Sequence, residues 1–178
     1  MDSINKNQSE HNRADLQGQQ AIARIKDMAE EHNCFFCTNI KAENSSGARP
    51  MNVLQVDEQG NLWFLSSKDS FKNQELQDNP EVKLYFQGSA HSDFLELHGY
   101  ATVSTDKAKI KELWKPIIKT WFTEGIDDPR ITVIKVAPVE GYYWDTKHNH
   151  AIAGMKMLIG AALGKTLDDS VEGKIKRQ

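Results

Sequence analysis

The sequence Leu62-Trp-Phe-Leu-Ser-Ser-Lys-Asp-Ser-Phe-Lys-Asn-Gln-Glu-Leu-Gln-Asp-Asn-Pro80 predicts a strand, a polar turn and a short helix in succession. The apolar start, residues 62–65, favours a strand. The helix over residues 70–78 ends before Pro80, because proline disfavours helical backbone in the residue before it. Lys72 falls in the first turn of this helix.

This arrangement favours the binding of a phosphate. Free backbone N–H groups and the macrodipole at a helix start attract anions. The hydroxyls of Ser66, Ser67 and Ser70 and the ammonium of Lys72 add further donors. The same residues are also typical of an ordinary helix with a serine at its N-cap and a lysine exposed to solvent. The stretch alone leaves both interpretations open.

The composition is typical of one globular domain with a modest charge. The 178 residues include 22 Lys and Arg against 25 Asp and Glu, a net charge of -3, so we expect no nucleic-acid partner. No apolar run approaches the ~20 residues of a membrane span, so we expect no membrane partner. The polar first 20 residues lack the apolar centre of a signal peptide, which indicates a cytoplasmic protein.

The two cysteines, Cys34 and Cys37, have the spacing of a thioredoxin-like redox pair. That chemistry requires the first cysteine at a helix N-terminus, where its thiolate is stabilised. Here the pair lies in an apolar segment, residues 34–40, that predicts a buried strand, and residues three apart on a strand point to opposite faces. We therefore expect core cysteines that act as small hydrophobic residues, and no metal site.

The rest of the chain predicts strands joined by short turns, with helices inserted between them. We expect strands over residues 34–40, 48–56, 62–65, 82–86, 94–104, 131–136 and 139–144, and helices from residue 19, over residues 70–78 and from residue 106. The last helix should kink or break near Pro116. Runs of strands with short turns favour a mainly β protein, with its antiparallel sheet closed or split into a barrel.

Several short motifs follow one another in a distinctive order: Ala48-Arg-Pro-Met51, Leu62-Trp-Phe-Leu-Ser-Ser67, Ser70-Phe-Lys72, Asn79-Pro-Glu-Val82, Gly99-Tyr-Ala-Thr-Val103, Leu113-Trp114, Trp121-Phe122, Asp128-Pro129 and Tyr143-Trp-Asp145. Together they resemble the pyridoxamine 5'-phosphate oxidase-like FMN-binding split barrels, in particular the general stress protein branch. The resemblance implies an antiparallel split β-barrel domain over residues 19–145. Residues 1–18 would form a flexible N-terminal arm and residues 146–178 a C-terminal tail that ends charged and mobile.

The resemblance also implies a flavin site at the interface of a homodimer. The Arg-Pro-Met strand would lie beside the flavin ring and ribityl chain, the end of the next strand would contact the chain and phosphate, and the helix-start lysine would bind the phosphate. A tryptophan of the last strand would approach from the partner subunit. The implied cofactor-binding residues are Arg49, Pro50, Met51, Leu65, Ser66, Ser67, Ser70, Phe71, Lys72 and Trp144. The implied cofactor is FMN.

Two departures from the oxidase members of that family refine the functional prediction. Phe71 stands where they have an arginine before the phosphate-binding lysine, which admits FAD or riboflavin beside FMN. The segment 147–154 lacks their Arg-x-His-Asp-Arg signature for the pyridoxal-type substrate, so we do not expect pyridoxamine phosphate oxidation. We expect a flavin-dependent oxidoreductase of unknown substrate with a stress-response role. The alternatives are a non-catalytic protein for flavin binding, storage or sensing, and a reductase of the deazaflavin type.

Overall fold

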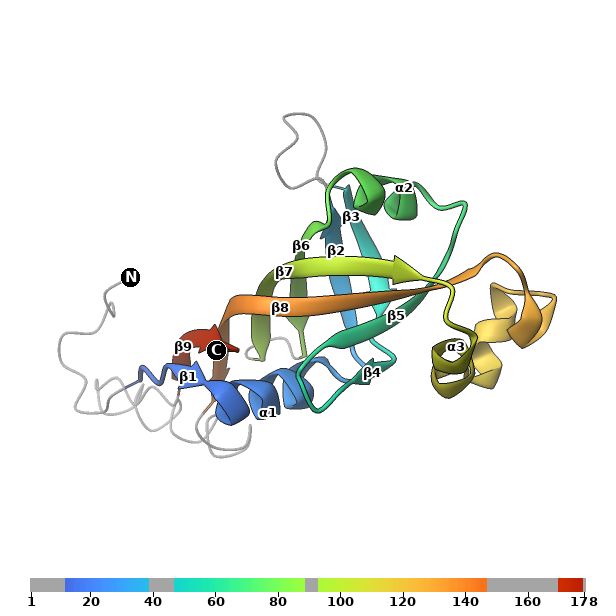
Figure 1. The fold of residues 1–178 in the computed structure, drawn as a ribbon. Helices are drawn as coiled ribbons and strands as arrows, with labels where there is room; N and C mark the ends of the chain where they lie inside the picture. Colours follow the sequence, from blue (N-terminus) through green and yellow to red (C-terminus); the bar gives the residue numbers. More distant parts are fainter. Residues whose placement is uncertain (1–11, 39–46, 89–92, 147–169, 178) are drawn as a thin grey trace, which may run out of the picture.

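A curved β-sheet forms the body of the protein in the computed structural model, which describes residues 12–38, 47–88, 93–146 and 170–177 (Figure 1). Its strands are β1 (Leu16–Gln17), β2 (Asn33–Thr38), β3 (Gly47–Asn52), β4 (Gln55–Val56), β5 (Leu62–Ser67), β6 (Glu81–Gln87), β7 (Phe94–Ser104), β8 (Ile131–Thr146) and β9 (Ser170–Lys176). The helices are α1 (Gly18–Ala29), α2 (Phe71–Asp78) and α3 (Lys107–Leu113), with short 3-10 turns η1 (Pro116–Thr120) and η2 (Gly125–Asp127). Helix α3 ends before Pro116, which confirms the predicted break.

The sheet is split between β3 and β5. From β3 the strands follow in the order β2, β6, β7 and β8, and β5 pairs with the first half of β8. The chain itself crosses the split, because β4 follows β3 and pairs with β5. The predicted mainly β split barrel with inserted helices is therefore confirmed. The sheet is mixed, however, and not purely antiparallel, since β1 and β9 run parallel.

Strand β8 is one continuous element of 16 residues, so the prediction of two strands joined at Ala137-Pro138 was wrong. The proline is accommodated where the register with β7 shifts between His98 and Gly99. At that point a Cβ on Gly99 would lie 2.4 Å from the carbonyl oxygen of Ala137, so only glycine allows this approach. A β-bulge thus lets the strand pass a residue that cannot donate a ladder hydrogen bond.

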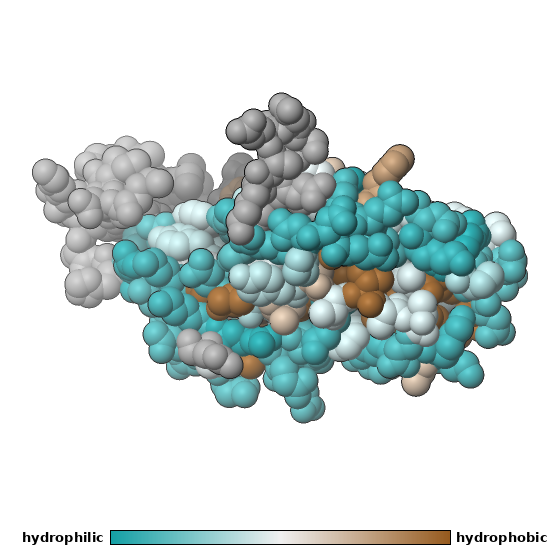
Figure 2. Space-filling view, turned by 45° about the horizontal axis from the view of Figure 1, so that its top comes forward, coloured by the Kyte–Doolittle hydropathy of each residue, from teal (hydrophilic) through white to brown (hydrophobic). Residues whose placement is uncertain are grey.

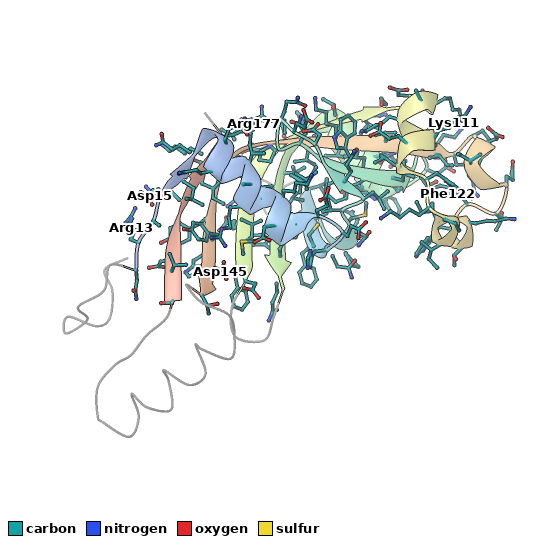
Figure 3. The ribbon with its side chains drawn as sticks, turned by 90° about the horizontal axis from the view of Figure 1, so that it is seen from below. Arg13, Asp15, Lys111, Phe122, Asp145 and Arg177 are labelled. Carbon is teal, nitrogen blue, oxygen red and sulfur yellow. The ribbon has the colours of Figure 1, made fainter. Side chains whose placement is uncertain are left out.

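The core lies between α1 and the concave side of the sheet, and a second apolar cluster joins α3 and η1 to β8. Figure 3 shows α1 lying across the strands, while Lys111 and Phe122 mark the far end of the molecule, where the second cluster lies. The buried face of α1 consists of Ala21, Ile25, Met28 and Ala29. In the view of Figure 2 the surface is mainly hydrophilic, with apolar side chains gathered in a band between hydrophilic ridges.

The two cysteines belong to the core, as predicted. Cys34 and Cys37 are buried free thiols on strand β2. Burial raises the pKa of Cys34 to about 12, so this thiol stays protonated at neutral pH. A buried neutral thiol is a poor nucleophile, which argues against the thioredoxin-like alternative.

The N-terminal and C-terminal segments add strands to the sheet. Strand β9 pairs with the second half of β8, and β1 pairs with β9. Ile175 of β9 is buried in the main core, and the lysines on either side of it point to solvent. The prediction of a flexible arm and a mobile tail was therefore wrong for residues 12–17 and 170–176. The many charged residues concealed an alternating strand pattern.

The packing of Ile175 gives a direct test of this attachment. Substitution of Ile175 by alanine should lower the free energy of unfolding by about 2–4 kcal/mol, because a buried isoleucine leaves a cavity when truncated. The neighbouring Lys176→Ala should change it by less than about 0.5 kcal/mol, since that side chain is exposed. Urea denaturation of both variants measures the difference. Equal stability of wild type and Ile175→Ala would mean that β9 is not part of the cooperative fold.

Candidate functional site

The two strands at the split each have a free edge. Strand β3 pairs with β2 on one side, and no described strand pairs with its other side. Strand β5 pairs with β8 along its whole length, but with β4 only at residues 62 and 63. Residues 47–52 and 64–67 therefore present backbone N–H and C=O groups that no described strand uses. Such edges can hydrogen-bond a flat polar ligand.

Helix α2 begins directly after β5 and is capped by Ser70. The Ser70 hydroxyl accepts a hydrogen bond from the backbone N–H of Asn73 at 3.3 Å and lies 3.3 Å from the hydroxyl of Ser66. The predicted serine cap is thus confirmed. The N–H groups of Phe71 and Lys72 belong to the first turn, where a helix offers them no partner of its own.

Lys72 is buried and not exposed, contrary to the simpler interpretation of a solvated lysine. It is 6% exposed and makes no hydrogen bond or direct ion pair with any described residue. Loss of solvent, with a smaller contribution from the positive charge of Arg49, lowers the pKa of Lys72 to about 8, against an opposing effect of Glu75. A buried cation without a partner is unfavourable. The site therefore favours an added anion.

Arg49 is already paired. Its Nη2 donates to Glu75 Oε1 at 2.8 Å, and its Nη1 lies 2.7 Å from Glu75 Oε2 in the same ion pair. Nη1 donates to the hydroxyl of Thr38 at 2.9 Å and to the carbonyl of Gly47 at 2.7 Å. Hydrogen bonds from Arg49 and, to a lesser extent, from the Thr38 hydroxyl hold the pKa of Glu75 below its usual value. Because Arg49 and Glu75 neutralise each other, the group formed with Lys72 carries a net charge of +1.

A second buried group next to the start of α2 lacks a partner. The amide nitrogen of Asn73 donates to the Thr132 hydroxyl at 2.8 Å, and that hydroxyl donates to the carbonyl of Ser66 at 2.8 Å. A carbonyl only accepts, so the Thr132 hydroxyl must accept from Asn73, and this determines the orientation of the amide. Asn73 Oδ1 is left buried, with no hydrogen-bond partner in the described part of the chain. A single unsatisfied acceptor of this kind is uncommon in a core.

The other predicted residues of the two strands take different positions. Arg49 and Met51 point toward the core side of β3, whereas Pro50 lies on the opposite, exposed face. Leu65 is half-buried and packs against the second apolar cluster, and Phe71 is exposed. The structure thus brings Arg49, Ser66, Ser70 and Lys72 to the two sides of the split, around the start of α2.

Trp144 is not near these residues in the same chain. Ser66 pairs with Thr132 near the start of β8, whereas Trp144 lies twelve residues further along that strand. At ~3.3 Å per residue the separation is about 40 Å. Figure 3 agrees, since Asp145, the next residue, is far from Lys111 and Phe122. Trp144 therefore does not belong to the group of residues at the start of α2 in its own chain. The segment 147–154 lies outside the described residues.

Sequence reasoning missed Thr38, Glu75, Asn73 and Thr132, which set the charge and the hydrogen bonds of the site. Thr132 is 66 residues from Ser66 in sequence, so no local pattern joins them. The nearest signal was the polar composition of the helix over residues 70–78, in which Asn73 and Glu75 follow Lys72.

The remaining described surface offers less specific features. An open hollow of about 700 Å³ lies between α1 and the turn before β5, lined by Gln19, Ile22, Ala23, Lys26, Asp57, Glu58, Gln59 and Arg177, none of them predicted site residues. Within the described ranges no three His, Cys, Asp or Glu side chains are placed to hold a metal ion. None of the helices described is both long enough and apolar enough to cross a membrane.

Comparison with known proteins identifies the family. The model of a family described as "Pyridoxamine 5'-phosphate oxidase like" matches residues 20–168. The chain belongs to this family. Among characterised sequences it is 28% identical over 90 residues to Protein bli-3 of Neurospora crassa, a match that covers 46% of this chain and 43% of that protein. The chain thus aligns with less than half of that relative.

Solved structures of general stress proteins share the fold. A candidate general stress protein 26 from Jannaschia sp. CCS1 superposes with a TM-score of 0.71 at 19% identity, over 87% of this chain and 94% of that chain. General stress protein 26 from Bacillus anthracis str. Sterne superposes with a TM-score of 0.59 at 21% identity, over 70% of this chain and 92% of that chain. A general stress FMN/FAD binding protein from Xanthomonas citri superposes with a TM-score of 0.56 at 24% identity, over 66% of this chain and 82% of that chain. The resemblance inferred from the sequence motifs is confirmed.

The burial of Lys72 predicts an unusual dependence of stability on pH. Its pKa is about 8 when folded and about 10.4 when unfolded, so between these values the unfolded chain binds more protons and stability rises with pH. Lys72→Met, which keeps the length of the side chain without its charge, should stabilise the ligand-free protein at pH 7 by roughly 1–3 kcal/mol. The difference in the free energy of unfolding between Lys72→Met and the wild type should become smaller toward pH 10.

Denaturant unfolding of wild type and variant at pH 7 and pH 10 measures the effect. The exposed Lys68→Met serves as the matched control and should show no such difference. A destabilised Lys72→Met at pH 7 would mean that the ammonium has a favourable partner in the ligand-free protein.

Proposed function

We propose that this protein binds a flavin nucleotide at the split between β3 and β5, with the flavin phosphate at the start of α2. The observation that carries the proposal is Lys72, a buried ammonium with no hydrogen bond or ion pair to any described residue. A phosphate there would supply the missing counter-charge, at a helix start that already attracts anions. FMN is the smallest flavin with this phosphate, and FAD contains the same unit.

The described residues divide the binding between them. Lys72, the hydroxyls of Ser66 and Ser70 and the free N–H groups of the first turn would hold the phosphate. The unpaired backbone edges of residues 49–51 and 64–67 would hydrogen-bond the ribityl chain and the polar edge of the ring. Arg49, whose charge Glu75 neutralises, would shape the site more than bind the phosphate. A bound flavin supplies the redox chemistry, and the protein supplies binding, orientation and tuning.

The site is completed, in this proposal, by a second copy of the chain in a homodimer. Trp144 is too far along β8 to reach Lys72 of its own chain, and it is 41% exposed beside the ring of Tyr142. The convex side of the sheet also carries an apolar row in which Phe35 pairs with Pro50 and with Tyr85. Phe35 is 59% exposed, which is unusual for a phenylalanine in the middle of a strand. Burial of this row would favour association.

With the flavin in place, we propose an oxidoreductase of unknown substrate with a role in the stress response. Membership of the pyridoxamine 5'-phosphate oxidase-like family and the fold shared with general stress proteins support this assignment. A non-catalytic flavin binder is the alternative, and one observation favours it. The carboxylate of Glu75, on the same helix as Lys72, is held by Arg49 and Thr38 and so is not free for proton transfer. Reduction with turnover by NADH or NADPH would distinguish the enzyme from the binder.

Flavin titration tests the proposed phosphate-binding site at the start of α2. The purified protein should take up FMN and show flavin absorbance bands. Lys72→Met should weaken the binding of FMN by about tenfold or more, because one charge-assisted contact is lost. It should change the affinity for riboflavin by less than about twofold, because riboflavin has no phosphate. Lys68→Met is the control. Equal losses for both ligands would refute the phosphate role, and a protein that takes up no flavin would refute the proposal as a whole.

Sedimentation tests the dimer. The wild type should sediment as a dimer at micromolar concentration, and Phe35→Glu should yield monomers that lose flavin. Ile117→Glu, an equally drastic change at an exposed residue of η1, should leave the dimer intact. A monomer that retains flavin with wild-type affinity would contradict a site shared between two copies.

A further inference from the structure

The environment of Lys72 favours a second chemistry besides the attraction of an anion. The side chain is buried, and among the described residues it has no hydrogen bond or direct ion pair. The charge of Arg49 disfavours the ammonium, and the carboxylate of Glu75, which would favour it, is held in contacts with Arg49 and Thr38. A lysine that is desolvated beside another cation releases its proton readily, and the neutral amine is a nucleophile.

The neutral form of Lys72 is well populated at neutral pH. With its pKa at about 8, about a tenth of this side chain is unprotonated at pH 7, against less than about a thousandth for a lysine with the usual pKa of about 10.4. The charged form serves to bind an anion. The neutral form remains available to attack an electrophile.

The groups around the start of α2 indicate which electrophile suits this amine. The hydroxyls of Ser66 and Ser70, 3.3 Å apart, and the free N–H groups of the first turn can hold an anionic oxygen. An acyl phosphate, the mixed anhydride of a carboxylic acid and phosphoric acid, combines a phosphate with an electrophilic carbonyl in one small molecule. If its phosphate binds at the helix start, the carbonyl is held near the amine and the reaction becomes effectively intramolecular.

We propose that Lys72 is a site of covalent modification by acyl phosphates such as acetyl phosphate. The neutral amine attacks the acyl carbon, a C–N bond forms, and the bond from that carbon to the phosphate oxygen breaks. Phosphate leaves with the electron pair, and the amine loses its proton to solvent. The product is an uncharged amide, so acylation and anion binding at Lys72 exclude each other. The inference rests on the proposed function in one respect, the phosphate-binding site at the start of α2.

Peptide mass spectrometry of the full-length wild type treated with acetyl phosphate tests this assignment, with the exposed Lys68 as the matched control. At pH 7 acetyl phosphate should modify Lys72 at least about tenfold faster than Lys68, because far more of the buried amine is neutral. The rate at Lys72 should rise with a midpoint near pH 8 and then level off, whereas the rate at an exposed lysine rises up to about pH 10. Excess inorganic phosphate should slow the reaction at Lys72 and leave Lys68 unchanged, because it competes for the same site.

A second reagent separates the reactivity of the amine from recognition of the phosphate. N-hydroxysuccinimidyl acetate transfers the same acetyl group but has no phosphate. Its preference for Lys72 over Lys68 should therefore be at least about threefold smaller than that of acetyl phosphate. Equal preferences with the two reagents, unaffected by inorganic phosphate, would overturn the assignment to acyl phosphates.

Comparison with flavin binding keeps the two proposals apart. Acetylation of Lys72 no faster than that of Lys68, in a protein that binds FMN, would overturn this inference and leave the proposed function intact. Rapid acetylation of Lys72 in a protein that takes up no flavin would refute the proposed function alone. Where both hold, saturating FMN should protect Lys72, and the protein acetylated at Lys72 should bind FMN about tenfold more weakly, because the charge-assisted contact is lost.

Discussion

Continuous pairing along β8 is the constraint on which the rest of the structure depends. One edge of this strand pairs with β7 throughout, and the other is shared by β5 and β9. The bulge at Gly99 lets the strand pass Pro138 without losing either partner. Because β5 is attached to the first half of β8, the segment that leads into α2 leaves the sheet near the start of β8, while Trp144 lies near the other end of that strand. The distance between the two halves of the proposed site follows from the length of one strand.

Burial of charge at the split links stability to function. Arg49 and Glu75 form a compact pair whose hydrogen bonds with Thr38 satisfy it internally, and Gly47 permits the close approach that this requires. Among the described residues Lys72 has no such partner, so its desolvation destabilises the fold. The orphaned acceptor of Asn73 adds a smaller cost of the same kind. Unfavourable groups that cluster at one point, in a core that is otherwise well satisfied, are typical of a binding site whose ligand offsets them.

Much of the fold and part of the site could be predicted from local patterns. The strand over residues 94–104 and the serine cap before α2 were predicted correctly, because each depends only on residues that are neighbours in sequence. Continuous β8 was missed, because tolerance of Pro138 depends on a register shift in another strand. Strand β9 was missed, because a segment rich in lysine and glutamate becomes a strand only where β8 offers it an edge. In the candidate site, the hydrogen bond between Asn73 and Thr132 was not predicted, because it joins residues that are distant in sequence.

The sequence by itself determined a mainly β chain with a strand, a serine-rich turn and a lysine-bearing helix start, because each of those features is encoded within a few consecutive residues. The order of its motifs carried the resemblance to the split barrels. It could not determine the charge state of that helix start. Whether Lys72 is solvated or buried, and whether Arg49 is free or paired, depends on side chains that meet only when β3 packs against α2. Tertiary structure decided both, because burial and pairing are properties of the three-dimensional neighbourhood and not of the local chain.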